Sequence, residues 1–186
     1  MDRSESRARE SIKLIIAKHY DRESGIYDES RFKTSTWYRR IDEETCKVLN
    51  MYLKGKTVLE LGAGTGRYGI FCSKRGFQWL GIDISSGMIN KARENFNKYG
   101  LNLSIIQGDV EDERLYPENY YDNVICVKSF AFFPNPKIVI KNVFKTLRNG
   151  GRFIVVTANN DSLYARIKRP KSDLMNFYSF RDMKNC

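Results

Sequence analysis

The sequence predicts an α/β fold in which a doubly wound, mostly parallel sheet carries helices on both faces. After position 57, apolar runs typical of strands alternate with helical patterns at intervals near 20 residues, which implies right-handed strand–helix–strand crossovers. The first of these strands leads into three glycines, Gly62, Gly64 and Gly66. Glycine permits positive φ angles and a close approach of a ligand to the backbone. We therefore expect a ligand to bind at this turn.

Length and composition favour one globular domain over residues 1–186. The chain is long enough for one full core and too short for two domains of ordinary size, with 29% charged and 41% hydrophobic residues. No apolar run approaches the roughly 18 residues that span a bilayer. The first seven residues carry mixed charge where a signal peptide needs an apolar stretch. We therefore expect a cytoplasmic protein.

Cysteine and histidine usage argues against a metal centre. The four cysteines are widely separated and form no CxxC pair, which predicts buried free thiols instead of a disulfide framework or a zinc site. They are Cys46, Cys72, Cys126 and Cys186. His19 is the single histidine of the sequence, so a site with several histidine ligands is excluded.

The net charge of +10 is concentrated in the last third of the chain. Residues 1–56 carry +3, residues 57–130 carry −1 and residues 131–186 carry +8. A basic flank of this kind can attract RNA or an acidic substrate. It can equally be an ordinary solvated surface, and the sequence leaves both interpretations open.

A helical region precedes the first strand. Ile12, Ile15 and Ile16 share one face of a helix predicted at 8–18. In doubly wound α/β domains, helices ahead of the first strand often lie over the ligand. We therefore interpret residues 1–54 as a helical lid.

A looser stretch at 19–35 separates this helix from a second one predicted at 36–53, and Gly55 suits the end of the second helix. Aromatic side chains of the lid could offer their π-faces to a bound cation, or they could serve packing alone. They are Tyr20, Tyr27, Trp37 and Tyr38.

The remaining elements follow from apolar runs, helical spacing and turn residues. Strands are expected at 57–61, 78–82, 103–107, 121–127 and 152–157, and helices at 66–75, from Met88 onward and at 137–147. The strand at 121–127 is nearly continuous in apolar residues, as expected for a strand buried on both faces.

The glycine turn fits two classes of ligand. The pattern Gly64-x-Gly66-x-x-Gly69 matches the fingerprint of dinucleotide-binding loops. Glu60, however, places a carboxylate at the end of the strand. That charge would repel a pyrophosphate and attract S-adenosylmethionine (SAM), which carries an ammonium and a sulfonium. Glu60 therefore favours SAM over a dinucleotide.

Asp83 is the predicted ribose ligand. It ends the second strand and stands 19 residues after Gly64, close to the interval at which an acidic residue holds a ribose. Its carboxylate can accept both vicinal hydroxyls. The alternative is that Asp83 only caps the next helix, but Ser85 and Ser86 already suit that role.

The third strand ends in Gly108-Asp109-Val110. At the carboxyl end of a parallel strand, the carboxylate of Asp109 can accept from an adenine amino group, while the amide of Val110 meets a ring nitrogen. Ile84 and Met88 are suitable apolar partners for the adenine faces.

Together these segments resemble the successive motifs of the class I SAM-dependent methyltransferases. The resemblance covers residues 55–157, in the order of the family, and is carried by Glu60-Leu61-Gly62-Ala63-Gly64-Thr65-Gly66, Gly81-Ile82-Asp83-Ile84-Ser85 with Met88, Gly108-Asp109-Val110, Tyr121-Asp122 and Leu147-Arg148-Asn149-Gly150-Gly151-Arg152. It implies a seven-stranded Rossmann-like sheet with SAM across the carboxyl ends of strands one to four.

By position, the resemblance also assigns roles around the reacting methyl group. Glu60, Gly62, Ala63 and Gly64 would meet the methionine part of SAM, and Lys128 would lie near the methionine part or the methyl. No catalytic residue is assigned, although the lid places His19, Tyr20 and Asp21 as candidate bases.

Two features depart from the family pattern. The last two strands of the family fold, strands six and seven, are expected to be missing, so that 158–186 forms an incomplete substrate region. Either the sequence is a piece of a longer protein, or another chain covers the exposed sheet edge, as in a homodimer. Lys128-Ser129-Phe130 also lacks the Asp/Asn-Pro-Pro-aromatic signature of enzymes that methylate exocyclic amino groups of bases. The sequence has no Pro-Cys pair, which argues against the cysteine-based RNA cytosine methyltransferases.

The predicted function is transfer of a methyl group from SAM to a small-molecule acceptor by in-line displacement, for which alignment and desolvation supply much of the acceleration. Three alternatives stay open. They are an RNA or protein methyltransferase that uses the basic last third, a catalytically silent SAM-binding subunit, and a nicotinamide-dependent oxidoreductase.

Overall fold

A computed structural model of the chain describes residues 3–157. Five parallel strands form one sheet in the order β3-β2-β1-β4-β5. The strands are β1 (Thr57–Leu61), β2 (Gln78–Asp83), β3 (Ile105–Gln107), β4 (Tyr121–Val127) and β5 (Leu147–Val156). The parallel sheet confirms the predicted α/β fold. The expectation for strands six and seven concerns 158–186, outside the described residues.

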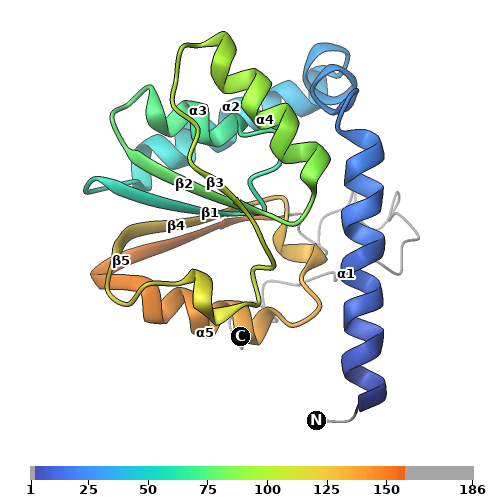
Figure 1. Cartoon of the computed structure of the whole chain (residues 1–186). Coiled ribbons are helices and arrows are strands. Elements are labelled where there is room, and N and C mark those ends of the chain that lie inside the picture. The colour runs from blue at the N-terminus through green and yellow to red at the C-terminus, as the bar shows by residue number, and fades with distance from the viewer. Residues whose placement is uncertain (1–2, 158–186) are drawn as a thin grey trace.

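Helices lie on both faces of the sheet, and one helix lies across the ends of its strands (Figure 1). The helices α2 (Thr36–Tyr52), α3 (Arg67–Ser73) and α4 (Ser86–Lys98) lie on one face, and α5 (Pro136–Thr146) lies on the other. The long helix α1 (Arg3–Glu23) lies beside the carboxyl ends of the strands. Short helices occupy Glu29–Lys33, Glu113–Leu115 and Phe130–Phe132. This arrangement leaves α1 as a cover over the carboxyl ends of the strands.

The core has two parts because successive side chains of a strand point to opposite faces of the sheet. In β1, Leu59 and Leu61 pack toward the α5 side, whereas Val58 packs with Trp79 and Phe96 beneath α3 and α4. All five residues of β1 are buried. In β4 every residue except Asp122 is buried, which explains why the strand at 121–127 reads as a nearly continuous apolar run.

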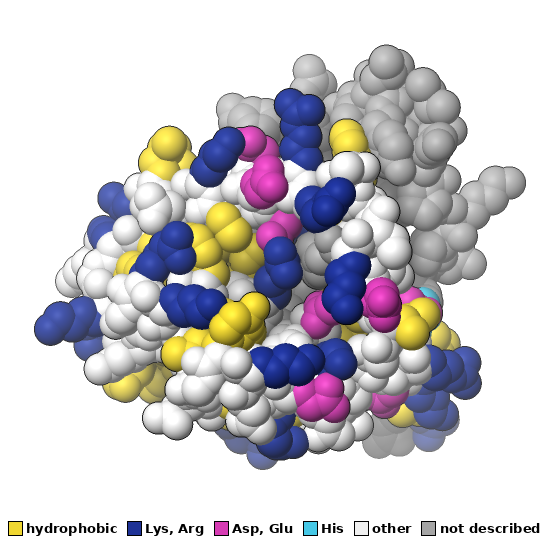
Figure 2. All heavy atoms as spheres, turned by 90° about the horizontal axis from the view of Figure 1, so that it is seen from above, with side chains coloured by type: hydrophobic (Ala, Val, Ile, Leu, Met, Phe, Trp, Pro, Cys, Tyr) yellow, Lys and Arg dark blue, Asp and Glu magenta, His cyan; other side chains and the backbone are white. Residues whose placement is uncertain are grey.

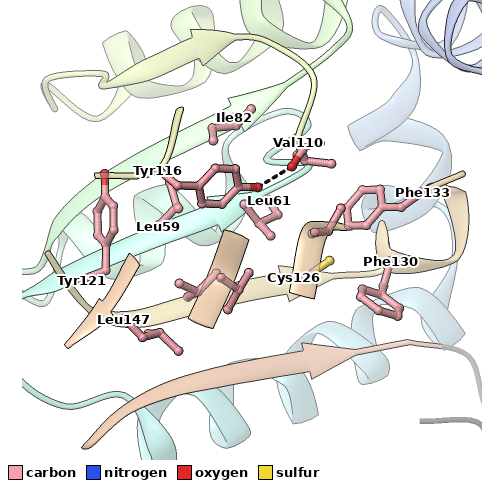
Figure 3. Packing of buried hydrophobic residues seen from close by; sticks show 13 residues of the cluster. Leu59, Leu61, Ile82, Val110, Tyr116, Tyr121, Cys126, Phe130, Phe133 and Leu147 are labelled. Carbon is pink, nitrogen blue, oxygen red and sulfur yellow. Dashed lines mark hydrogen bonds between the residues drawn. The ribbon is translucent and has the colours of Figure 1, made fainter. Parts of the chain in front are cut away.

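The α5 side of the core includes a polar contact that supports the edge of the ligand site (Figure 3). The Tyr116 hydroxyl donates a hydrogen bond of 2.7 Å to the backbone carbonyl of Val110. Tyr116 is 3% exposed, so this bond satisfies a hydroxyl that would otherwise be costly to bury. The loop after β3 is thereby held against the core.

The N-terminal helix differs from its prediction in length and in orientation. It spans Arg3–Glu23 instead of 8–18, and Ile15 is 49% exposed while Lys13 is buried. The expected inward position of Ile15 is therefore wrong. The inward stripe instead contains Lys13, Ile16 and Tyr20, whose spacing places them on one face of a helix. A lysine can occupy this stripe because three carboxylates surround its ammonium.

Gly55 serves a different purpose from the predicted helix end. Helix α2 ends at Tyr52, and Gly55 adopts a φ of 63°. A Cβ at this position would lie 2.4 Å from the Cγ of Asp122. Glycine is thus required because the chain passes directly over the Asp122 carboxylate.

That carboxylate anchors the start of β1 to β4. Asp122 Oδ2 accepts from the backbone amides of Lys56 and Thr57 at 2.7 and 3.0 Å, and from the Thr57 hydroxyl at 3.0 Å. The hydrogen bond from Lys56, together with those from Thr57, lowers the pKa of Asp122 to about 2. The Tyr121-Asp122 motif therefore has a structural role at the sheet end opposite the ligand.

The part of the chain that the structure describes contains no helix of the length and apolarity needed to cross a membrane.

We predict that Asp122→Ala lowers the free energy of unfolding at pH 7 by about 2 kcal/mol, because it leaves backbone donors without their charged acceptor. The folded-state pKa lies below the ordinary 3.8, so the contribution is present above about pH 4 and is lost as the pH falls toward 2. Urea unfolding at pH 7 and pH 3 measures the difference. As a control, Glu118→Ala removes an exposed ion pair with Lys145 and should cost less than about 0.5 kcal/mol. Equal losses for the two variants would contradict the anchoring role.

Candidate functional site

A cavity lies at the carboxyl ends of the strands, beneath α1. Its empty volume is about 750 Å³ when the open solvent at its mouth is included. Helix α1, the glycine turn, the ends of β2 and β4, and the loop after β3 form its walls. The lining residues are Lys13, Ile16, Tyr20, Tyr27, Gly62, Gly64, Asp83, Ile84, Met88, Gly108, Asp109, Val110, Val127, Lys128, Ser129, Phe132, Phe133 and Pro134.

The glycine turn forms the floor of this cavity. Gly62, Gly64 and Gly66 have φ angles of 69°, 54° and 74°, a region that favours glycine. A Cβ on Gly62 would lie 2.4 Å from the Cβ of Ser129, and one on Gly66 would lie 2.8 Å from the ring of Phe96. A Cβ on Gly64 would meet no atom within 4 Å. Gly62 and Gly66 are therefore needed for close packing, whereas Gly64 leaves open space beside the backbone.

Asp83 ties the glycine turn to the start of α4. Its Oδ2 accepts from the Gly64 amide at 2.7 Å, and its Oδ1 accepts from the Ser85 amide at 2.9 Å. Burial raises the pKa of Asp83, and these amides partly offset the rise. Each carboxylate oxygen has a second lone pair, so Asp83 can still accept from a ligand. Ser85 caps α4 through its side chain, as expected.

Lys13 occupies the end of the cavity beside Asp109. Its Nζ lies 2.6 Å from Asp109 Oδ2 and 3.0 Å from Glu111 Oε2, and Glu10 contributes a third contact. Burial lowers the pKa of Lys13, but the hydrogen bonds to Asp109, Glu111 and Glu10 outweigh it and raise the pKa. The lid thus places a cation against the carboxylate that the sequence assigned to the adenine amino group.

Ile84, Met88 and Val110 line the same part of the cavity as Asp109. Met88 and Val110 are buried, at 2% and 8% exposure. These apolar side chains, together with the neighbouring carboxylate, form a wall suited to a flat heterocycle that carries an amino group.

Glu60 and Ala63 are not among the residues that line the cavity. Glu60 is 1% exposed, and its Oε2 accepts from the indole nitrogen of Trp79 at 2.9 Å. Burial raises the pKa of Glu60 to about 8. Ala63 packs beneath the turn, against Gly81. A Cβ added to Gly81 would lie 2.7 Å from the Cβ of Ala63. Both residues therefore support the turn from below.

Two carboxylates hold the lid region over the site. Asp21 Oδ1 accepts from the Ser85 hydroxyl at 2.7 Å and from the Gly87 amide at 2.8 Å. Asp28 accepts from Thr65 and Asn95 at 2.7 and 2.8 Å. The segment 3–33 is thereby attached to the glycine turn and to the start of α4.

The three candidate bases differ in position. His19 is exposed on α1, and Asp21 is engaged at the start of α4. Tyr20 lines the cavity, where burial raises its pKa. A tyrosine with a raised pKa keeps its proton at neutral pH, so it is unsuited to the role of base.

Lys128 follows β4 at the other end of the cavity. It has a φ of 61°, which is uncommon for a residue with a side chain. Its Nζ lies 5.4 Å from the centre of the Tyr38 ring, and burial lowers its pKa. Arg31 lies over the rings of Tyr27 and Tyr38, at 4.5 and 5.4 Å.

Several of the lining residues have no predicted role in ligand binding. Lys13, Ile16, Ser129, Phe132, Phe133 and Pro134 belong to this group. Their sequence pattern does not indicate a binding site, since a lysine within a helix and an aromatic run after a strand are both common in surfaces and cores. Of the four lid aromatics, Tyr20 and Tyr27 line the cavity, Tyr38 lies beside Lys128, and Trp37 is 56% exposed.

Within residues 3–157, no group of three or more histidine, cysteine or acidic side chains is arranged to hold a metal ion. Cys72 and Cys126 are buried free thiols and Cys46 is partly buried, while Cys186 lies outside the described residues.

A sequence model described as "Methyltransferase domain" matches residues 58–151. The chain is 28% identical over 123 residues to a ubiquinone biosynthesis O-methyltransferase of Aeromonas salmonicida, covering 66% of this chain and 48% of that protein. It is 32% identical over 108 residues to a fatty-acid O-methyltransferase of Mycolicibacterium smegmatis, covering 57% and 38%. The chain thus spans less than half the length of these relatives.

Among solved structures, the PH0226 protein from Pyrococcus horikoshii OT3 is similar, with a TM-score of 0.72 and 26% identity. The similarity covers 85% of this chain and 84% of that one. The common architecture therefore extends beyond the matched segment to most of the chain.

We predict that Glu60→Gln, which replaces the buried carboxyl by an amide, removes a pH-dependent loss of folding stability. With its pKa near 8 instead of 4.5, Glu60 keeps its proton in the folded protein while the unfolded chain loses it. The wild type should therefore lose stability relative to Glu60→Gln between about pH 5 and pH 8, by up to roughly 1.4 kcal/mol per pH unit. Urea unfolding across this range measures the difference.

Glu94→Gln provides the control, because the Glu94 side chain is 60% exposed and should show no such trend between pH 5 and 8. A constant difference between wild type and Glu60→Gln would show that Glu60 is ionised when folded.

Proposed function

The chain belongs to the methyltransferase domain family, and we propose that it transfers a methyl group from SAM to a small-molecule acceptor. The observation that carries this proposal is the cavity beneath α1, in which an open glycine turn, the ribose-type carboxylate of Asp83 and the acidic wall at Asp109 lie together. SAM supplies a methyl group on a positively charged sulfur, which an acceptor atom can take by in-line displacement.

The residues of the cavity fit this cofactor. In our proposal Asp83 holds the ribose hydroxyls, Ile84 and Met88 contact the adenine, and Gly62 and Gly64 border the methionine part. The open space beside Gly64 supports the last assignment, because a side chain there would enter the region that the cofactor needs.

At the adenine end, Asp109 would accept from the amino group and Val110 would offer its amide. Lys13 is an additional member of this site in our proposal, since it shares Asp109 Oδ2. Glu60 and Ala63 would act from beneath the turn, where they shape it without touching the ligand. This changes the role that family resemblance assigned to these two residues.

A small acceptor fits the covered site better than a polymer does. Helix α1 and the attachments of Asp21 and Asp28 close one side of the cavity. On the face over α2, α3 and α4, Lys and Arg side chains are spread out with Asp and Glu side chains among them (Figure 2), where an RNA surface would gather one sign of charge. The names of the two relatives, both O-methyltransferases, also favour an oxygen nucleophile.

Two further proposals concern the whole protein. We place its activity in the cytoplasm, in one SAM-binding domain composed of the lid, the core and the region after 157. Within residues 3–157, β5 pairs with β4 alone, and a second copy joining at the free side of β5 would form a homodimer.

Cofactor identity can be tested by thermal shift with SAM, S-adenosylhomocysteine and NAD, since a ligand that binds the folded state raises its apparent stability. The proposal expects a rise with the first two and none with NAD. A rise with NAD alone would support the oxidoreductase alternative. RNA binding that weakens steeply with added salt would support an RNA substrate.

We predict that Asp83→Asn weakens binding of both SAM and S-adenosylhomocysteine by at least about tenfold, because it removes charge-assisted acceptors worth roughly 1.5–3 kcal/mol each. Isothermal titration calorimetry measures the two dissociation constants. The matched control is Asp112→Asn, at a carboxylate that caps the helix Glu113–Leu115 outside the cavity, and it should leave both unchanged. Unchanged SAM affinity in Asp83→Asn would refute the ribose assignment.

A further inference from the structure

A lysine of α1 contacts the carboxylate at the adenine end of the cavity. The side chain of Lys13 is 11% exposed. Its Nζ lies 2.6 Å from Asp109 Oδ2, 3.0 Å from Glu111 Oε2 and 3.0 Å from Glu10 Oε1. An ammonium has three N–H donors, and each of them faces a carboxylate of the protein. Lys13 is therefore suited to hold Asp109 in place and is not suited to donate to a ligand.

Glu111 is the anchored member of this acidic group. Its side chain is 9% exposed, and its Oε1 accepts from the backbone amide of Asn135 at 2.6 Å. Asn135 is the residue that caps α5. The carboxylate of Glu111 is thus bound on one side to the start of α5 and on the other to Lys13, which gives the ammonium a fixed position.

The orientation of Asp109 depends on two contacts. Its Oδ1 accepts from the Glu111 amide at 2.9 Å, and its Oδ2 lies against Lys13. Each carboxylate oxygen has a second lone pair, so Asp109 can accept from an amino group while it keeps both contacts. The Asp109 side chain is 31% exposed, which leaves it accessible from the cavity that it lines.

The ammonium also separates two like charges. Lys13 lies within hydrogen-bond distance of both Asp109 and Glu111, so the two carboxylates are close neighbours. Without the cation they would repel each other. Glu111 is buried and bound to Asn135, whereas Asp109 is the more exposed of the two. Asp109 is consequently the carboxylate that would turn away from its present position.

From these contacts we propose that Lys13 is a positioning residue, which fixes the Asp109 carboxylate as the acceptor for the amino group of the cofactor's adenine. This inference rests on the proposed function and extends it, because selection of the amino group then depends on a residue of α1. The purine is recognised jointly by the loop after β3 and by the N-terminal helix.

The first test compares two ligands in the native protein. One is S-adenosylhomocysteine, and the other is its desamino analogue, in which hydrogen replaces the amino group of the purine. Calorimetry should show that the analogue binds at least about tenfold more weakly, because it lacks the donor that Asp109 accepts. Equal affinities would overturn this inference and leave the proposed function intact. Binding of neither ligand would refute the proposed function itself.

Lys13→Gln then tests the role of the ammonium. The difference in affinity between the two ligands should fall to less than about threefold, because Asp109 is no longer held in place. A lysine that only attaches α1 to the core would act on both ligands alike. Equal weakening of both ligands, with their difference preserved, would therefore overturn the proposal. The matched control is Lys47→Gln, which removes an exposed ion pair with Glu44 on α2 and should preserve the difference.

A second measurement follows Lys13 in the native protein, so it does not depend on the folding of Lys13→Gln. Lysine side chains are labelled with nitrogen-15, and the ammonium signal of Lys13 is identified by its loss in Lys13→Arg, which retains the charge. S-adenosylhomocysteine should shift this signal clearly more than the desamino analogue does, because only the amino group shares the Asp109 carboxylate with Lys13. A signal that neither ligand shifts, or that both shift equally, would contradict the positioning role.

Discussion

The contact between the Asp83 carboxylate and the Gly64 amide is the constraint on which the site depends. It joins the end of β2 to the turn after β1, and through the second oxygen it also holds the first residues before α4. Three left-handed glycines make this geometry accessible. Because Asp83 is almost fully buried, its charge is affordable only while these amides point at it. Each carboxylate oxygen keeps a second lone pair, which can accept from a ligand.

The lid and the core are coupled through charge as well as through packing. Lys13 contacts the acidic loop after β3, Asp21 contacts the start of α4, and Asp28 contacts Thr65 and Asn95. These contacts attach the lid to three separate parts of the core. Breaking a buried ion pair by removing one partner is costly, so the contacts of Lys13 help to hold α1 against the core.

Similarity of fold does not by itself specify a reaction, because function depends on the site that a fold carries. The solved structure most useful for comparison shares the architecture over most of the chain, whereas the curated relatives extend well beyond the matched part. The chemistry therefore depends on the cavity, where the carboxylates at the ends of β2 and β3 suit a cationic adenosyl ligand.

The parallel strands, the glycine turn and the acidic residues at the ends of β2 and β3 could all be predicted from the sequence. These features follow from local rules, since apolar periodicity and the position of glycine are read directly along the chain. Three contacts could not be predicted in this way: Lys13 faces inward, Glu60 accepts from Trp79 beneath the turn, and Lys128 lies beside the Tyr38 ring. These contacts join residues distant in sequence, and their orientation depends on how the lid packs against the sheet, which no local pattern encodes.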